Sequence, residues 1–182
     1  MSRPARVLLG VGGGIAAYKL AIVASRLVQA GVGVRVAMSR HAHDFVGRRT
    51  FEGLTGRPTI VSSTQVDPDG GVPHIDAPRE ADAYVIAPAT ADLLARLAAG
   101  VADCPVTLAA IACRSRRIVC PAMNDAMWND PATQRNVARL SELGFERLGP
   151  DEGWLAEGYA AVGRMVEPEA ILAALGVPEG GA

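Results

Sequence analysis

The fold is decided by the stretch RVLLGVGGGIAA at residues 6–17. After Arg6 the stretch begins with an almost continuous apolar run, which is typical of a parallel strand buried on both faces. Three glycines follow, and residues 15–30 then carry apolar side chains at helical spacing up to Gly31, a residue typical of the end of a helix. The stretch therefore predicts a strand, a glycine turn and a helix.

Similar strand and helix patterns alternate along the rest of the chain. We predict strands at residues 32–38, 57–62, 83–87 and 117–120, and helices at 41–47, 90–100, 104–113, 131–143 and 168–175. For 104–113 a buried strand is the alternative. Gly, Pro and Asp interrupt the pattern at 64–73 and 149–163, which predicts loops. This alternation predicts one α/β domain over residues 1–177, with a doubly wound parallel sheet between two helix layers. Residues 178–182 are predicted to form a disordered tail.

The composition argues against several classes of protein. A chain of 182 residues can bury one full core, and 49% hydrophobic with 4% aromatic residues predicts a core of Ala, Val, Leu and Ile. A net charge of -1 gives no electrostatic case for nucleic acid or an acidic membrane. We find no segment suited to spanning a bilayer and no signal-peptide core, so a cytoplasmic protein is expected.

The three cysteines, Cys104, Cys113 and Cys120, make an odd number and lie in apolar segments. Their spacing matches no Cys or Cys/His metal motif. We therefore predict buried, reduced thiols and no metal site.

The glycine turn is a candidate phosphate site. Residues 12–17 satisfy the pattern G-x-G-x-x-A between a strand and a helix, where glycines admit a phosphate and the helix start supplies amide donors. An ordinary tight turn is the alternative. The second strand ends in MSRH at 38–41, without the carboxylate usual for a nicotinamide dinucleotide. Ser39 could bind the phosphate of a mononucleotide such as FMN, accept the 2′-phosphate of NADP with Arg40, or cap the next helix.

Polar side chains follow two further strands, at 88–92 (PATAD) and 121–128 (PAMNDAMW). Ligands of open α/β sheets bind at the carboxyl ends of the strands, where Thr90 and Asn124 would offer hydrogen bonds. The alternatives are that Thr90 and Asn124 cap helices and that Met123, Met127 and Trp128 fill the core. His74, near the end of the 64–73 loop, is a candidate general base because its ordinary pKa lies near neutrality. His41 and His43 are expected at the surface.

Together these residues resemble the homo-oligomeric flavin-containing cysteine decarboxylases. That family includes phosphopantothenoylcysteine decarboxylase and the peptidyl-cysteine decarboxylases of lantibiotic-type peptides. The resemblance runs from about Val7 to Pro168 and is carried by residues 12–19, His74-Ile75 ahead of Ala81-Asp82, 88–92 with 100–103, and 121–128. The last stretch is similar to the signature P-x-M-N-x-x-M-W at every defined position. The resemblance implies a Rossmann/flavodoxin-like three-layer sandwich.

The resemblance also implies FMN held between the subunits of a trimer, with larger assemblies up to a dodecamer possible. It implies His74 as the catalytic base and Asn124 as the residue that holds the substrate carboxylate. The residues implied for the cofactor are Gly12, Gly13, Gly14, Ile15, Ser39, Pro88, Ala89, Thr90, Asp92 and Ala122. The residues implied for the substrate are Asn124, Met127, Trp128, Trp154, Glu157 and Tyr159.

One position departs from the enzymes of coenzyme A synthesis. Where they carry a Cys-Gly pair in the late loop, this chain has Glu157-Gly158. Because that cysteine supplies a proton when the enethiol product is reduced, we expect catalysis to stop at the enethiol. The first hypothesis is therefore oxidative decarboxylation of the C-terminal cysteine of a precursor peptide. The alternatives are decarboxylation of 4′-phosphopantothenoylcysteine, with Glu157 as a replacement acid if burial raised its pKa, and a flavin-binding or electron-transfer protein without decarboxylase activity.

Overall fold

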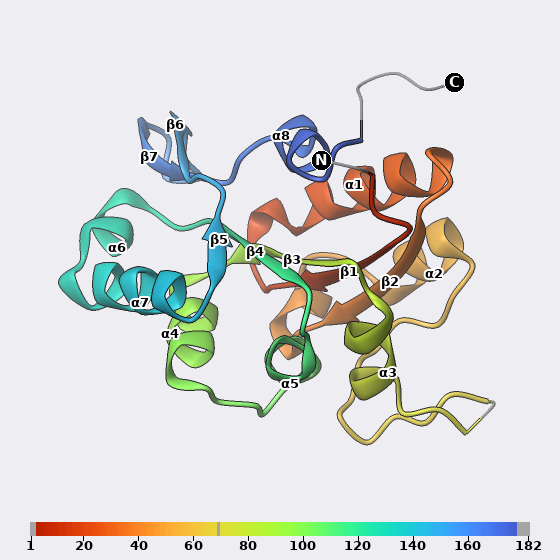
Figure 1. Ribbon diagram of the computed structural model, residues 1–182. Coiled ribbons are helices and arrows are strands. Elements are labelled where there is room, and N and C mark those ends of the chain that lie inside the picture. The colour runs from red at the N-terminus through yellow and green to blue at the C-terminus, as the bar shows by residue number, and fades with distance from the viewer. Residues whose placement is uncertain (1–2, 69, 178–182) are drawn as a thin grey trace.

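The computed structural model describes residues 3–68 and 70–177. Their centre is a parallel sheet in the order β2-β1-β3-β4-β5, with helices on both faces (Figure 1). The strands are β1 (Arg6–Val11), β2 (Gly33–Met38), β3 (Ala83–Ala89), β4 (Arg116–Pro121) and β5 (Phe145–Arg147). The predicted α/β fold with a doubly wound parallel sheet is confirmed.

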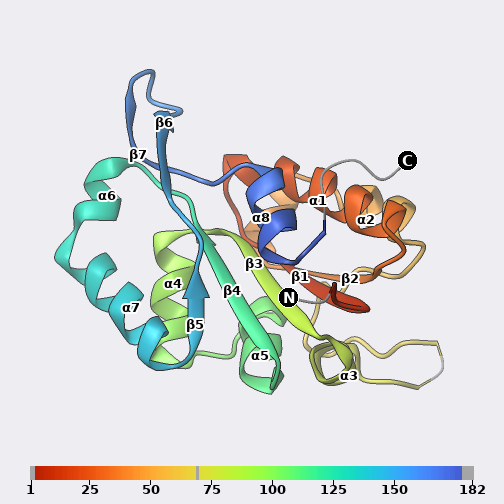
Figure 2. The same ribbon diagram turned by 45° about the horizontal axis from the view of Figure 1, so that its top comes forward.

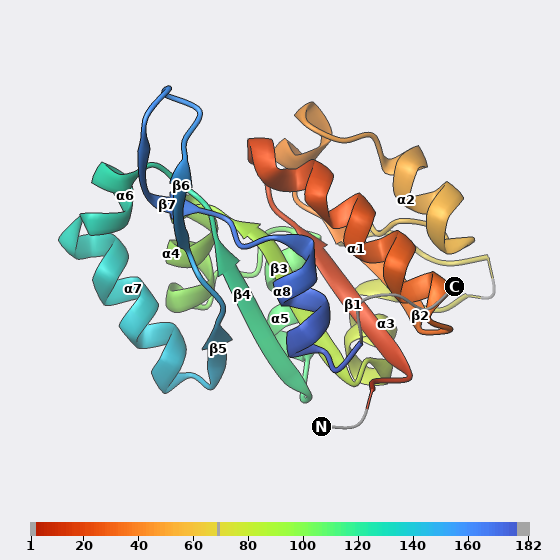
Figure 3. The same ribbon diagram turned by 90° about the horizontal axis from the view of Figure 1, so that it is seen from above.

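Two separate hydrophobic clusters hold the layers together. One joins the sheet to α1 (Tyr18–Gln29), α2 (Arg48–Thr55) and α8 (Pro168–Ala174). The other joins the opposite face to α3 (Pro73–Glu80), α4 (Ala91–Ala99), α5 (Pro105–Ala112) and α7 (Pro131–Glu142). Figure 3, seen from above, shows α1 and α8 lying over the same face of the sheet. A sheet buried on both sides explains why its strands read as continuous apolar runs.

The remaining short elements lie at the ends of the strands. The 3-10 helices η1 (Ile15–Ala17) and η2 (Arg40–Asp44) follow β1 and β2, and α6 (Asp125–Asn129) follows β4. A separate antiparallel hairpin, β6 (Asp151–Trp154) and β7 (Ala160–Arg164), projects beside α6 (Figure 2). The elements that follow strands thus gather at the carboxyl edge of the sheet.

Several sequence-based boundaries are wrong. The strand predicted at 57–62 is reduced to one bridge, in which Ile60 pairs with Ala37 at the edge of β2. Proline at 58 has no amide to donate to a ladder. The loop predicted at 149–163 contains the β6–β7 hairpin, whose mostly exposed strands lack a clear apolar alternation. Helix α2 and strand β5 were not predicted.

The histidine candidate lies in a helix rather than in a loop. Pro73 begins α3, so His74 is in its first turn. Proline is favoured at the first helical position because its missing amide would be unpaired there. The predicted tail at 178–182 lies outside the described residues.

The cysteine prediction is confirmed in part. Cys113 and Cys120 are buried free thiols, whereas Cys104 is only half-buried. Burial raises the pKa of Cys120 to about 12, so this thiol stays protonated at neutral pH. Within residues 3–68 and 70–177 no group of three or more metal-binding side chains occurs. No helix in this part of the chain could cross a membrane. The expected cytoplasmic location and oligomeric assembly stay predictions.

Candidate functional site

A cavity of about 580 Å³ lies at the carboxyl edge of the sheet. Three segments from distant parts of the sequence line it: the start of α1, the segment between β4 and α6, and the β6–β7 hairpin. Thr90 adds the end of β3. The lining residues are Gly14, Ile15, Ala16, Tyr18, Lys19, Thr90, Ala122, Met123, Asn124, Met127, Trp154, Leu155, Ala156, Glu157, Gly163, Arg164 and Met165. The position agrees with the general rule for ligand sites in open α/β sheets.

The glycine turn needs glycine mainly because other parts of the chain pack against it. A Cβ at Gly12 would lie 2.0 Å from the carbonyl oxygen of Pro88, and one at Gly13 would lie 2.5 Å from Cβ of His41. At Gly14 the nearest atom would be 3.4 Å away, an ordinary contact, and only this glycine of the three lines the cavity. Gly12 and Gly13 therefore bring the three strand ends together, and Gly14 faces the space for a ligand.

The helix start beside Gly14 offers unpaired donors. Ala17 donates its amide to the carbonyl of Gly14 at 2.9 Å, while the amides of Ile15 and Ala16 lie at the beginning of η1, where no preceding turn supplies an acceptor. η1 continues directly into α1, whose dipole favours an anion at this end. Ile15 is 69% exposed. The start of this helix can therefore accept a phosphate group.

Ser39 does not cap the helix that follows it. Its backbone is extended at the end of β2, its amide donates to Val11 at 2.9 Å, and its hydroxyl accepts no hydrogen bond from η2. Ser39 does not line the cavity of the isolated chain. Ser39 lies near the glycine turn, because His41, two residues on, packs against Gly13.

The PATAD segment contains both a cavity-lining residue and residues that are buried in the fold. Thr90 lines the cavity and its hydroxyl also accepts a hydrogen bond from Leu93 at 3.3 Å, so the capping alternative is confirmed for this residue. Pro88 and Ala89 are buried in β3 and do not line the cavity.

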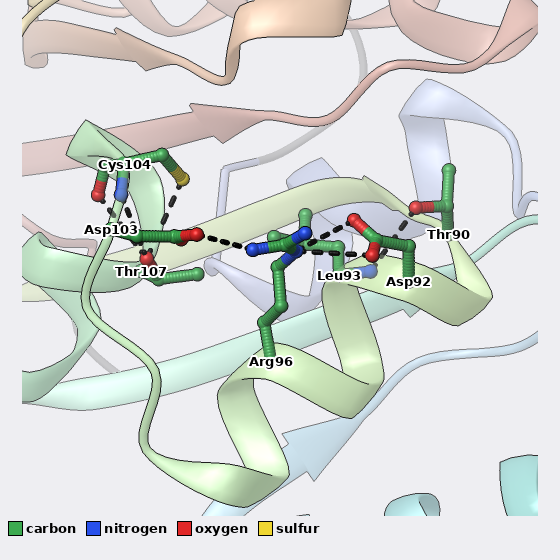
Figure 4. Close-up of polar contacts among 7 residues, drawn as sticks. All are labelled: Thr90, Asp92, Leu93, Arg96, Asp103, Cys104 and Thr107. Atoms are coloured by element: carbon green, nitrogen blue, oxygen red, sulfur yellow. Dashed lines mark hydrogen bonds and ion pairs between the residues drawn. The ribbon is translucent and has the colours of Figure 1, made fainter.

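Asp92 is engaged by an arginine rather than directed into the cavity. Its carboxylate lies 2.9 Å from Nε of Arg96, which also binds Asp103 (Figure 4). The hydrogen bonds that Arg96 donates to Asp92 and to Asp103 raise the pKa of Arg96 further above its already high value. This network ties the first turn of α4 to the loop before α5, which gives Asp92 a structural partner.

Asn124 combines a cap with a free donor. Its Oδ1 accepts the amide of Met127 at 2.9 Å, so Asn124 caps α6 as one alternative anticipated. That bond occupies the amide oxygen. The two Nδ2 hydrogens have no hydrogen-bond acceptor among residues 3–68 and 70–177. Because Asn124 lines the cavity, it can donate to a carboxylate there.

The apolar residues of the signature point in different directions. Met127 lines the cavity and is 47% exposed, so it is not core filler. Trp128 does not line the cavity: the guanidinium of Arg147 lies 5.7 Å from the centre of its ring, on the β5 side. The structure therefore gives no support to a substrate contact by Trp128 in this cavity.

The hairpin supplies the opposite wall. Trp154, 68% exposed, and Glu157 both line the cavity, as the resemblance implied. Tyr159 does not line it; instead its hydroxyl donates to Asp125 at 2.6 Å. Glu157 is exposed, so the burial on which its role as a replacement acid depended is absent at this position.

Lys19 is a cavity residue that sequence reasoning missed. Its side chain is 6% exposed, and its Nζ lies 3.1 Å from the carbonyl oxygen of Met165 and 3.0 Å from a carboxylate oxygen of Glu167. The hydrogen bond from Lys19 lowers the pKa of Glu167. Arg164, also in the cavity wall, pairs with the same glutamate. Lys19 is the only lysine in the sequence, and this was a signal that could have directed attention to it.

His74 and Asn124 do not meet within one chain. His74 belongs to α3, a helix whose contacts are with α5 and β1, and it does not line the cavity. Its Nδ1 atom is buried without a hydrogen-bond partner. The two residues implied to be catalytic therefore require a further element before they could act on one substrate.

Comparison with known proteins places these features in one family. The family model described as Flavoprotein matches residues 1–176. The coenzyme A biosynthesis bifunctional protein CoaBC of Vibrio vulnificus is 42% identical over 170 residues, which is 92% of this chain and 42% of that protein. The chain thus spans less than half the length of the curated relatives it matches.

Two solved structures share nearly the whole fold. The FMN-dependent cysteine decarboxylase SpaF has a TM-score of 0.80 and 35% identity, covering 93% of this chain and 94% of that one. A PPC decarboxylase with a cysteine-to-serine mutation, complexed with pantothenoylaminoethenethiol, has a TM-score of 0.83 and 31% identity, covering 95% and 97%. Cysteine decarboxylases of both kinds are therefore similar to this chain.

Proposed function

Because this chain belongs to the flavoprotein family, we propose that it is an FMN-dependent decarboxylase of a cysteine derivative. The observation that carries the proposal is the cavity itself. Asn124, whose amide oxygen is taken by the helix cap, and the helix start at Ile15 both line it, together with mainly apolar residues. A carboxylate and a phosphate-bearing aromatic cofactor are the two ligands that this arrangement suits.

The residues present fit FMN. The amides at the start of η1 and the hydroxyl of Ser39 would hold the phosphate, and the apolar wall around Met127 and Trp154 would receive a flat ring system. Bound FMN would supply the two-electron oxidation of the cysteine side chain, and the resulting thioaldehyde would be the electron sink that lets CO2 leave. The protein has to hold the carboxylate, remove the thiol proton and exclude water.

Asn124 is the proposed carboxylate holder. Its cap on Met127 fixes the orientation of the amide, so the donors are in place before the substrate arrives. This preorganisation reduces the cost of ordering the side chain on binding. The donors bind a group that is lost as neutral CO2, so they orient the scissile bond rather than stabilise the product.

His74 is the proposed base for the thiol proton. Since His74 lies outside the cavity of its own chain, the proposal requires His74 of the partner subunit to complete the site, as a trimer with FMN between subunits would allow. The buried and unpaired Nδ1 atom supports an incomplete environment in the single chain. Dilution to monomer should then abolish turnover.

The substrate that the comparisons support better is 4′-phosphopantothenoylcysteine, not the peptide that sequence reasoning placed first. Relatives at 42% identity are coenzyme A biosynthesis proteins. The precursor peptide remains a second candidate because Glu157 stands at the cavity wall where the coenzyme A enzymes carry cysteine. We propose that on either substrate the reaction ends at the enethiol, with oxygen or another acceptor taking up the two electrons left on the flavin.

Mass spectrometry distinguishes these outcomes. The purified protein, reconstituted with FMN, is given 4′-phosphopantothenoylcysteine or a synthetic peptide ending in cysteine. Loss of CO2 and two hydrogens, about 46 mass units, marks the enethiol, and loss of CO2 alone, about 44, marks the reduced product. Asn124→Ala should abolish both while retaining FMN. A protein that takes up no FMN, or that changes neither substrate, would refute the proposed function.

Replacing Glu157 by cysteine tests the end point. Glu157→Cys should divert product from the enethiol to the reduced thiol if a proton donor is all that is missing. Ala156→Cys, one residue away on the same wall, is the matched control and should leave the enethiol as the product. If the wild-type protein already forms the reduced thiol, the proposed end point is wrong although the decarboxylase activity stands.

A further inference from the structure

The β6–β7 hairpin is attached at two places to residues 121–128, the signature segment. One attachment is between backbone groups and the other is between side chains. At its base, Met123 donates its amide to the carbonyl of Gly163 at 3.0 Å. The fit is so close that a Cβ on Gly163, whose φ is +151°, would lie 2.2 Å from the carbonyl oxygen of Met123. The base is therefore a backbone-to-backbone contact that leaves no room for a side chain at position 163.

At its tip the hairpin closes in a tight turn. Leu155 donates its amide to Tyr159 at 2.8 Å, and Gly158 donates to Leu155 at 3.1 Å. Leu155 is 6% exposed and so holds one end of the turn in the structure. The turn at 155–159 carries Glu157, which lines the cavity, and it is held closed by these two backbone hydrogen bonds.

A single side-chain hydrogen bond joins this tip to the signature helix in the described part of the chain. The hydroxyl of Tyr159 donates to Oδ1 of Asp125 at 2.6 Å. Asp125 directly follows Asn124 and begins α6. Tyr159 is 41% exposed, so water competes for the bond, and a contact of this kind stabilises its closed form by only about 1 kcal/mol.

The groups around the phenol favour its role as donor. The hydrogen bond to Asp125 raises the pKa of Tyr159, and the carboxylates of Asp125 and Glu157 raise it further. The hydroxyl therefore keeps its proton well above neutral pH. A neutral phenol beside two carboxylates can donate to one of them and accept nothing from either, which fixes the direction of the bond.

We propose that Tyr159 is a positioning residue: its hydrogen bond to Asp125 latches the 155–159 turn over the cavity, so that Glu157 and Asn124 face one substrate from opposite walls. The substrate named in this inference is taken from the proposed function, whereas the latch itself does not depend on that function. It replaces the direct substrate contact that the resemblance implied for Tyr159. The rigid base acts as the pivot and the weak tip as the part that opens.

The latch should govern substrate binding more than the chemical step. With the tip open, the wall bearing Glu157 moves away while Asn124 keeps its cap on α6. Substrate then meets only the wall that carries Asn124. Part of its binding free energy is used to close the 155–159 turn, so its apparent affinity falls. Loss of the latch therefore raises KM and leaves kcat and FMN affinity nearly unchanged.

Amide hydrogen exchange tests the latch without any substrate. In the FMN-loaded protein, Tyr159→Phe removes the hydroxyl and keeps the ring, and it should speed exchange of the amides of Leu155 and Gly158 about fivefold to tenfold. Arg139→Gln, which removes a surface ion pair on α7, is the control and should leave these amides unchanged. Unchanged exchange in Tyr159→Phe would overturn the proposal.

Kinetics then test the pairing. With 4′-phosphopantothenoylcysteine, or the cysteine-ending peptide if that is the substrate turned over, Tyr159→Phe and Asp125→Ala should each raise KM about tenfold with kcat within twofold. The double variant should be no worse than either single variant, because both remove one bond. Additive losses, or a loss confined to kcat, would contradict the latch. If wild-type protein turns over neither substrate, the proposed function fails while the exchange experiment still decides the latch.

Discussion

The two walls of the cavity are built on opposite principles. The glycine-turn wall, at Gly12 to Ile15, is an extension of the buried sheet, with Gly12 packed directly against Pro88. The hairpin wall is a two-stranded ribbon whose residues are mostly exposed and which is attached by a few contacts. The first wall tolerates almost no change in shape, whereas the second can differ between related proteins at little cost to the fold. Under the proposed function, the rigid wall would bind the cofactor and the adaptable wall would bind the substrate.

The largest effect is expected from Gly12→Ala, which attacks the rigid wall. Its new Cβ would meet a backbone carbonyl at 2.0 Å, and since backbone cannot move aside cheaply we expect a loss of about 3 kcal/mol in unfolding free energy together with loss of FMN binding. Chemical denaturation and flavin absorbance measure the two. Gly47→Ala, where a Cβ would meet nothing within 4 Å, is the matched control. Equal stability of the two variants would contradict the packing argument.

Compared with Gly12→Ala, Gly163→Ala should lower the unfolding free energy less and should weaken substrate binding rather than FMN binding. Its Cβ would also meet a carbonyl, that of Met123, but the hairpin can shift as a whole. We expect a loss of about 2 kcal/mol in stability, FMN retained, and KM raised at least tenfold. Titration with FMN and steady-state kinetics separate the two ligands. Loss of FMN binding here would show that the walls are not independent.

Lys19→Met removes the contacts by which α1, on the glycine-turn wall, binds Met165 and Glu167, which follow the hairpin. Two hydrogen bonds of a buried ammonium are lost and the carbonyl of Met165 is left unpaired, which should cost about 1–2 kcal/mol.

The contact between Lys19 and Glu167 should depend on pH. Because the folded state lowers the pKa of Glu167, the ion pair stabilises the protein fully above the ordinary glutamate range and is lost as pH falls through the lowered value. Unfolding free energy of the wild type should therefore fall more steeply below about pH 4.5 than that of Glu167→Gln, measured by denaturation at a series of pH values. Parallel curves would argue against the pair.

The smallest effects are expected from the two tryptophans, and they should differ in kind. Trp154→Ala removes an exposed ring from the cavity wall, so we expect unchanged stability and KM raised about fivefold, equivalent to about 1 kcal/mol. Trp128→Ala removes a ring packed beside Arg147 and should lower stability slightly with KM unchanged. Thermal unfolding and kinetics on both variants test this. The reverse result would restore the substrate contact that the sequence resemblance implied for Trp128.

Much of the rigid wall could be predicted from the sequence because its signals are local. Continuous apolar runs mark β1 to β4, and the glycines at 12–14 mark the turn, since burial on both faces leaves little choice of residue. The 57–62 segment shows the limit: it has strand-like residues but meets β2 through Ile60 alone. Whether a short apolar segment becomes a strand depends on the neighbour it reaches, which no local pattern contains.

By itself, then, the sequence determined the parallel α/β sheet, the glycine turn and the presence of Asn124 at a strand end, since each follows from periodicity or from a residue's own chemistry. Tertiary structure alone decided which side chains face the cavity. It turned Trp128 toward β5, assigned Asp92 to Arg96, joined Tyr159 to Asp125 and left His74 outside the cavity. The reason is physical: the orientation of a side chain at an element's end is set by packing against distant segments, and no spacing along the chain encodes those neighbours.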